Sequence, residues 1–256
     1  MEREAAPRGP GALLSPRLLG QDSSAMNPQD RLIIALDVDS KERAQRLIDQ
    51  LRPHAGMFKV GKELFTAAGP DMVRWIVEGG GRVFLDLKFH DIPNTVAKAV
   101  GSAAQLGAFF VTLHASGGRA MLEAAASALP AEGTQLLGVT VLTSHTDESL
   151  RETGAAGTVV ETVRRLAVLA RDSGIDGVVC SPHEITLIRE SVGDDLVIVT
   201  PGIRPRGAAK GDQARVTTPL EARRLGCDYI VVGRPITESD SPADAAKAIV
   251  EELSRG

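Results

Sequence analysis

The residues most suited to chemistry lie in the stretch 86–95, which reads Asp-Leu-Lys-Phe-His-Asp-Ile-Pro-Asn-Thr. It follows an apolar run at residues 82–85 that is typical of a strand. Residues two apart on a strand point to the same side, so Asp86 and Lys88 are expected to project together. Asp91 lies beyond the strand end, in a loop. Charges at a buried strand end are costly unless they are paired. The acid and the base therefore form either a structural ion pair or a catalytic site.

Glycine and arginine gather in two later loops. Residues 200–205 read Thr-Pro-Gly-Ile-Arg-Pro, and residues 233–236 read Gly-Arg-Pro-Ile. Glycines let backbone N–H groups approach an anion, and the forked guanidinium of Arg234 suits a phosphate. Arg204 or Arg234 alone could be a solvated surface charge, but the presence of both after consecutive apolar runs favours a phosphate site. Residues 202–213 are a candidate lid that closes over the bound anion.

The elements that must position these residues are short apolar runs alternating with amphipathic stretches. In the amphipathic stretches apolar residues recur at helical spacing. Ser181, Thr218 and Ser241 each precede a proline and then an acid, which predicts three capped helix starts. The apolar runs are continuous, as is typical of parallel strands covered on both faces. Besides the strand before Lys88, they are residues 32–36, 57–60, 109–113, 136–142, 177–180, 196–199 and 229–232.

Eight strand–helix units of this kind predict an α/β fold of the (β/α)8 TIM-barrel type. A doubly wound open sheet is the alternative fold. Its dinucleotide fingerprint is missing, because the three glycines at residues 79–81 follow a helix and do not open one.

A barrel would also bring the charged residues together. Active sites of barrels gather where the strands run into the following loops. Asp37, Lys59, Asp86 and Lys88 all lie at such ends. Adjacent strands would place them in an alternating array of acid and base, for which function is the better interpretation. An ion-pair network that closes the barrel is the structural alternative.

Composition limits the other possibilities. The chain has 256 residues and a formal net charge of -4 with acids and bases interspersed, so neither nucleic acid nor an anionic membrane is an expected partner. No apolar run reaches transmembrane length. Cys180 and Cys227 are expected to be buried thiols of a reducing cytoplasm. Cysteine and histidine do not cluster at zinc-ligand spacing. Residues 1–29 are rich in Pro, Gly, Ala and Ser and are expected to form a disordered extension, which leaves residues 30–256 as one barrel domain.

Short motifs at the run ends are specific: Ile-Ala-Leu-Asp at 34–37, Phe-Lys-Val-Gly at 58–61, the stretch 86–95, Val-Leu-Thr-Ser at 141–144, Gly-Val-Val-Cys-Ser at 177–181, Pro-Gly-Ile-Arg-Pro at 201–205 and Val-Gly-Arg-Pro-Ile at 232–236. Together they resemble the bacterial orotidine 5′-phosphate (OMP) decarboxylase family. The resemblance covers Arg31 to the C-terminus and departs from the pattern at no motif position that matters.

The resemblance implies a cytoplasmic enzyme that converts OMP to UMP and CO2 in pyrimidine biosynthesis, with no metal and no cofactor. It implies that Lys88 donates a proton to pyrimidine C6 and that Asp86, Asp91 and Lys59 complete a charged array. Asp91 and Thr95 would reach the neighbouring site, making the enzyme an obligate homodimer with shared active sites. The other implied contacts are Asp37 and Lys59 with the ribose hydroxyls, Thr143 with the pyrimidine, Arg234 and the Gly233 backbone with the phosphate, Gln213 with the phosphate from the lid, and Arg204 in the same loop.

Two other functions are compatible with parts of this pattern. Magnesium-dependent sugar-phosphate decarboxylases and synthases of the same barrel superfamily share an Asp-x-Lys-x-x-Asp core. A non-catalytic sensor of phosphate ligands would have no need for the proton donor Lys88. Among the histidines, His114 could face the pocket or have a core role, and His90 is expected to point away from Asp86 and Lys88.

Overall fold

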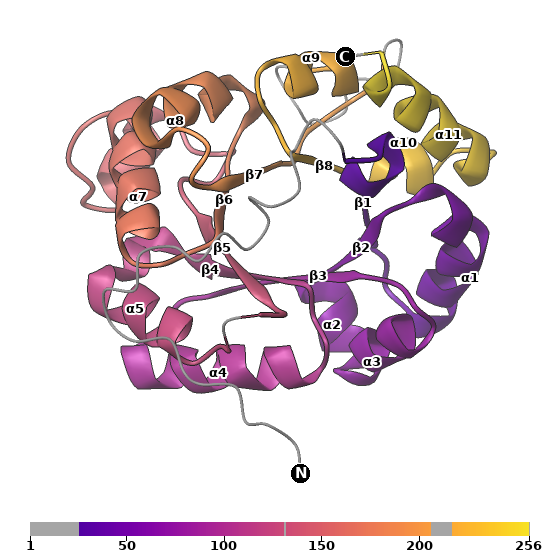
Figure 1. Ribbon diagram of the computed structural model, residues 1–256, viewed down its shortest axis with the longest axis horizontal. Coiled ribbons are helices and arrows are strands. Elements are labelled where there is room, and N and C mark those ends of the chain that lie inside the picture. The colour runs from indigo at the N-terminus through magenta and orange to yellow at the C-terminus, as the bar shows by residue number, and fades with distance from the viewer. Residues whose placement is uncertain (1–25, 131, 206–216, 256) are drawn as a thin grey trace.

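The computed structural model describes residues 26–130, 132–205 and 217–255. Within these ranges eight parallel strands pair in sequence order and close into a barrel, and the helices surround it (Figure 1). The strands are β1 (Leu32–Ala35), β2 (Met57–Gly61), β3 (Val83–Phe89), β4 (Phe110–His114), β5 (Gln135–Val139), β6 (Gly177–Val179), β7 (Val197–Thr200) and β8 (Tyr229–Val232).

The helices connect successive strands. The α-helices are α1 (Lys41–Leu51), α2 (Lys62–Ala68), α3 (Asp71–Glu78), α4 (Pro93–Gln105), α5 (Arg119–Ser127), α6 (Asp147–Glu152), α7 (Val159–Asp172), α8 (Ile185–Val192), α9 (Pro219–Arg224), α10 (Arg234–Thr237) and α11 (Pro242–Leu253). Short 3-10 helices are η2 (Pro28–Arg31), η3 (Arg52–His54), η4 (Ala115–Gly117) and η5 (Pro182–Glu184).

The predicted (β/α)8 barrel is confirmed. Parallel pairing of β1 with β8, for example Ile34 with Val232, closes the sheet, so the alternative of an open doubly wound sheet is wrong. The predicted strand at residues 136–142 is shorter than expected. β5 ends at Val139, and Thr143 therefore lies in the loop that follows. No helix within the described ranges is long and apolar enough to cross a bilayer.

Two apolar layers hold the barrel. Side chains alternate along each strand, so one set points inward and the other packs beneath the helices. The inner cluster contains three aromatic rings in edge-to-face contact: Phe110 lies edge-on to Phe84, with ring centroids 6.0 Å apart, and to Tyr229 at 5.2 Å. The outer cluster takes the opposite residues of the strands and the buried helix faces. The barrel interior is thus a packed plug that forms the floor below the carboxyl ends of the strands.

The described chain begins just before the barrel. Of the predicted disordered extension, residues 1–25 lie outside the described residues. Met26 packs against the inner cluster, and the Asn27 side chain accepts a hydrogen bond from the backbone N–H of Gln29 at the start of η2.

The three predicted helix starts differ in their capping. Thr218 makes a capping box with Glu221: its hydroxyl accepts from the Glu221 N–H at 3.2 Å, and the Glu221 carboxylate accepts from the Thr218 N–H at 2.9 Å. Ser181 makes the same box, but with the 3-10 helix η5. Ser241 makes no such bond to the backbone, and its hydroxyl donates to the Asp244 carboxylate at 2.7 Å. The capping prediction is therefore wrong in detail for Ser241.

This difference predicts unequal costs for two similar substitutions. Thr218→Ala should lower the free energy of unfolding by about 1 kcal/mol, the usual cost of losing an N-cap. Ser241→Ala should cost less than half as much, because no backbone N–H loses its partner. Urea unfolding of both variants checks this. Equal losses would show that the hydroxyl of Ser241 caps its helix after all.

Candidate active site

One cavity of about 330 Å³ opens where the strands of the barrel end. Its floor includes Ala35, Phe84 and Val231 of the inner cluster. It brings together most of the residues that the sequence singled out, from the first, second, third, fifth, seventh and eighth strand ends: Asp37, Lys59, Asp86, Lys88, Thr143, Arg204, Gly233 and Arg234. Residues separated by nearly 200 positions in the sequence thus share one site, as expected for the predicted barrel fold.

Charged groups form a continuous chain across one wall of this cavity. The Lys88 ammonium donates to both carboxylate oxygens of Asp86, at 2.7 and 2.8 Å. Lys59 lies 3.7 Å from the other side of the Asp86 carboxylate and donates to Asp37 at 2.8 Å. The alternating array of acid and base is therefore present, in the order Asp37, Lys59, Asp86, Lys88.

Asp86 is the centre of the array and is largely buried, with 13% of its side chain exposed. Burial alone would raise the pKa of its carboxyl group. The ammonium groups of Lys59 and Lys88 and the hydrogen bonds from Lys88 and Thr112 outweigh this effect and hold the pKa below its ordinary value of 3.8. Asp86 is consequently an anion at neutral pH, fixed between two cations.

The backbone at Lys88 is unusual. Its φ is +54°, and no other non-glycine residue in the described part of the chain has a positive φ. Such a conformation costs about 1–2 kcal/mol for a residue with a Cβ. It accompanies a break in strand pairing: β3 and β4 pair at Leu85 with Val111 and next at Phe89 with Leu113. Between these pairs lie residues 86–88 of β3 but only Thr112 of β4. Regular alternation along a strand therefore does not account for the meeting of Asp86 and Lys88.

Thr112 of β4 bridges this break and was not among the predicted site residues. Its hydroxyl accepts from the Lys88 N–H at 2.9 Å and donates to Asp86 Oδ1 at 3.0 Å. The available signal was one polar residue in the otherwise apolar run at 109–113. That signal identifies an inward hydroxyl but not its partners, because these depend on the irregular register.

The opposite wall contains the glycine and arginine loops. Gly233 directly precedes α10, and Arg234 is the first residue of that short helix. A Cβ on Gly233 would lie 3.4 Å from the Ala35 side chain, so the backbone lies close against β1. Gly202 has a φ of +81°, a conformation that favours glycine. Arg204 is buried, and its backbone N–H donates to the Thr217 carbonyl at 3.1 Å, which joins the two sides of the loop.

The remaining predicted residues lie elsewhere. Asp91 and Thr95 are exposed and do not line this cavity. The Asp91 carboxylate accepts from the Ile92 N–H at 2.6 Å, and the Ile92 side chain is 67% exposed. Gln213 and the lid beyond Pro205 lie outside the described residues.

Two histidines meet behind the array. The imidazole of His114, at the end of β4, lies against that of His90, with ring centroids 5.4 Å apart. His114 does not line the cavity. Its pKa is lowered by burial and by the nearby His90. His90 is exposed, and its ring lies against that of His114.

Both cysteines are free buried thiols, as predicted. Cys180 lines the cavity although only 1% of its surface is exposed. Burial raises its pKa well above the ordinary 9.0, and burial raises the pKa of Cys227 to about 12. Neither thiol is a nucleophile at neutral pH, because the thiolate is the reactive form.

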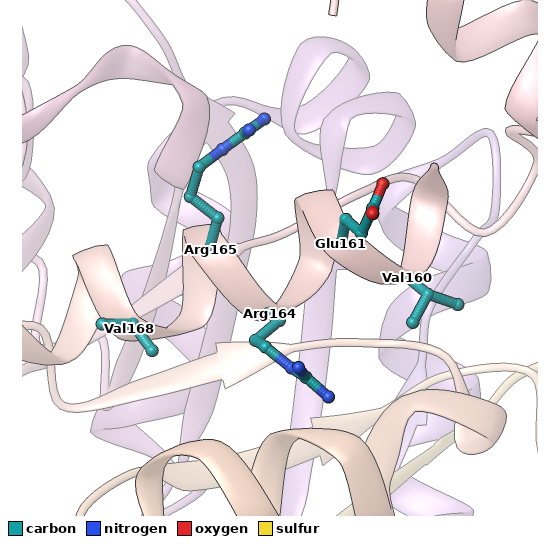
Figure 2. Close-up of a pocket in the computed structure, with 5 residues that line it drawn as sticks. All are labelled: Val160, Glu161, Arg164, Arg165 and Val168. Carbon is teal, nitrogen blue, oxygen red and sulfur yellow. The ribbon is translucent and has the colours of Figure 1, made fainter. Parts of the chain in front are cut away.

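A second hollow, of about 390 Å³, lies over the outer face of α7. A single helix supplies all of its lining (Figure 2). Arg164 and Arg165 point away from each other there, and Glu161 belongs to the N-terminal cap of the helix. With no convergent polar groups it is a surface depression, and the cavity at the strand ends is the candidate active site. No group of three or more metal-ligating side chains occurs among residues 26–130, 132–205 and 217–255.

The fold and the site define a (β/α)8-barrel enzyme with a lysine and aspartate array facing a glycine and arginine loop. A family model described as Orotidine 5'-phosphate decarboxylase / HUMPS family matches residues 30–249. The chain belongs to this family.

Individual relatives agree. The chain is 53% identical over 241 residues to the orotidine 5'-phosphate decarboxylase of Moorella thermoacetica, covering 91% of this chain and 96% of the relative. It is 55% identical over 226 residues to that of Halorhodospira halophila, covering 88% and 96%. The crystal structure of the Lactobacillus acidophilus orotidine 5'-phosphate decarboxylase matches with a TM-score of 0.78 and 43% identity over 87% of this chain and 98% of that one.

The position of Asp86 predicts a pH-dependent contribution to stability. A carboxyl group whose pKa is lowered by folding stabilises the protein above its unfolded pKa, and this stabilisation is lost as the pH falls through the folded value. At pH 7, Asp86→Asn should lower the free energy of unfolding by about 2 kcal/mol, since Lys88 loses its counter-ion and Lys59 keeps only Asp37. The difference should hold from pH 7 to 5 and shrink below 3.8. Urea unfolding across this range measures it, and a variant as stable as the wild type at pH 7 would contradict the prediction.

Proposed function

We propose that this protein decarboxylates OMP to UMP and CO2 in pyrimidine biosynthesis. The observation that carries the proposal is the Lys88 ammonium, held 2.7 Å from Asp86 on the wall of a cavity that Gly233 and Arg234 also line. OMP has a carboxylate on C6 of its pyrimidine and a phosphate at its other end, and the cavity offers Lys88 to the first and Arg234 to the second. The names of the relatives support the same reaction.

In the proposed complex the substrate spans the cavity. The phosphate binds Arg234 and the backbone at Gly233, with Arg204 on the closing loop. The ribose hydroxyls bind Asp37 and Lys59, and the pyrimidine contacts Thr143. Gln213 would add a contact to the phosphate from the lid. Binding energy from the remote phosphate can then be used to assemble the reacting end of the site.

Loss of CO2 leaves an electron pair on C6, in the plane of the ring, where no neighbouring π system can delocalise it. The Lys88 ammonium stabilises this charge as it develops and then transfers a proton to C6. Asp86, beside the departing carboxylate, raises the energy of the bound substrate relative to the transition state. Lysine supplies the proton, so this scheme requires no cofactor.

The second aspartate of the stretch 86–95, Asp91, is proposed to act in the site of another copy of the chain. Asp91 and Thr95 are exposed and lie outside the cavity of their own chain, next to the exposed apolar side chain of Ile92. A homodimer would cover Ile92 and bring Asp91 and Thr95 to the partner's site. The phosphorylated substrate and the two free thiols fit an enzyme of the reducing cytoplasm.

Removing the proton donor should separate binding from turnover. Lys88→Ala should still bind UMP but should lose turnover by at least about 1,000-fold, because general acid catalysis and charge stabilisation are both removed. The measurement is the loss of orotidylate absorbance with purified protein in excess chelator. Near-normal turnover by the variant would refute the role of Lys88. Activity that disappears in chelator would favour the magnesium-dependent sugar-phosphate class.

Sharing of the site predicts complementation between inactive variants. Lys88→Ala and Asp91→Ala proteins should each be inactive alone and regain activity when mixed and allowed to exchange subunits. A hybrid dimer then contains one site with both residues intact, so the mixture should approach about a quarter of wild-type activity if exchange is random. Mixing Lys88→Ala with an equal amount of wild-type protein should leave about half of the wild-type activity with or without exchange, so it controls for activity lost or gained on mixing alone. Absence of any rescue would argue against a shared site.

A further inference from the structure

Thr112 is a polar side chain in the apolar interior of the barrel. It lies on β4 two residues after Phe110, which belongs to the inner cluster, whereas the neighbouring Val111 and Leu113 belong to the outer cluster. None of its surface is exposed. A buried hydroxyl is costly unless its hydrogen bonds are made, so the partners of Thr112 explain why a hydroxyl is tolerated at this position.

The direction of both hydrogen bonds is determined by chemistry. The Lys88 N–H can only donate, so the hydroxyl accepts there at 2.9 Å. The Asp86 carboxylate is ionised and can only accept, so the hydroxyl donates its one proton to Oδ1 at 3.0 Å. A single oxygen atom therefore holds the backbone of one array residue and the side chain of another.

The bond to the Lys88 N–H falls where the strand ladder is missing. Between Leu85 and Phe89 the pairing of β3 with β4 is interrupted, and Lys88 there has a left-handed backbone conformation. In a regular ladder a carbonyl of the neighbouring strand would accept this N–H. The hydroxyl of Thr112 takes that place and supports a strained turn that directs the lysine side chain back to Asp86, at 2.7 Å.

We propose that Thr112 is a positioning residue for decarboxylation, which fixes the Lys88 backbone and the Asp86 carboxylate so that ammonium and carboxylate keep their relative places during the reaction. This role rests on the proposed function. Thr112 does not line the cavity, so it acts through Lys88 and Asp86. Loss of the Thr112 hydroxyl should slow the chemical step far more than it weakens substrate binding. Binding is proposed to depend largely on the phosphate contacts of Arg234 and the Gly233 backbone.

The test compares two substitutions at this position. Thr112→Val keeps the branched shape and removes the hydroxyl, whereas Thr112→Ser keeps the hydroxyl. Thr112→Val should lower kcat for OMP by about 10- to 100-fold and change KM by less than about threefold. Thr112→Ser should restore kcat to within about threefold of the wild type. Hydrogen exchange of the Lys88 amide should be faster in Thr112→Val and close to normal in Thr112→Ser, which reports on position independently of activity.

A matched control is available at the other end of the barrel. Thr134, which precedes β5, is also buried, and its hydroxyl donates to the Ala108 carbonyl at 2.6 Å. Thr134→Val loses a buried hydrogen bond as well, so it should lower stability but leave kcat and the Lys88 amide unchanged. Should Thr112→Val fail to fold, Thr112→Ala makes the same comparison with Thr112→Ser.

The outcomes distinguish the two proposals. If the wild type turns over OMP and Thr112→Val has the same kcat, the role of Thr112 is contradicted but the proposed function is not. A serine variant as slow as the valine variant also contradicts it, because packing rather than the hydroxyl would then be responsible. A wild type with no turnover of OMP contradicts the proposed function itself, and the role of Thr112 in that reaction with it.

Discussion

The Asp86 carboxylate is the interaction on which the site depends. It contacts two ammonium groups and a hydroxyl, which come from three adjacent strands of the barrel. Without that negative charge the two lysines would repel each other at one end of a largely apolar interior. With it, two cations and two anions occupy fixed places, and the Lys88 ammonium faces the cavity. The array depends on the pairing of β2, β3 and β4, and the closure of β8 onto β1 adds Gly233 and Arg234 to the same cavity.

The irregular part of β3 gives Asp86 and Lys88 the geometry that this ion pair needs. A regular strand would leave Asp86 and Lys88 side by side, with neither constrained to contact the other. The interrupted pairing and the left-handed Lys88 backbone instead bend the chain so that the ammonium bonds to both carboxylate oxygens. Backbone strain of this kind persists only where surrounding contacts hold it, and it is concentrated at functional sites.

The sequence predicted the barrel and the charged residues of the cavity because both follow from repeated local patterns. Continuous apolar runs identify buried strands, and charges at their ends fall at one mouth once the sheet closes. It could not predict the role of Thr112, since that depends on a register shift between β3 and β4 that no local pattern encodes. The behaviour of Ser241 was missed for a similar reason: the choice of its hydroxyl between a backbone N–H and Asp244 is set by side-chain geometry. The exposed position of Asp91 followed from its place beyond the strand end. The group that Asp91 would contact in another copy of the chain cannot be derived from a single chain.

The buried thiol of Cys180 has a consequence for inhibitor chemistry. Cys180 lines the cavity, which would invite an electrophilic warhead on a nucleotide analogue. Because burial raises its pKa, the group is presented to ligands as a neutral, polarisable surface. Tight reversible ligands can therefore gain from soft contacts at this position, whereas alkylating compounds aimed at it would find almost no thiolate to capture.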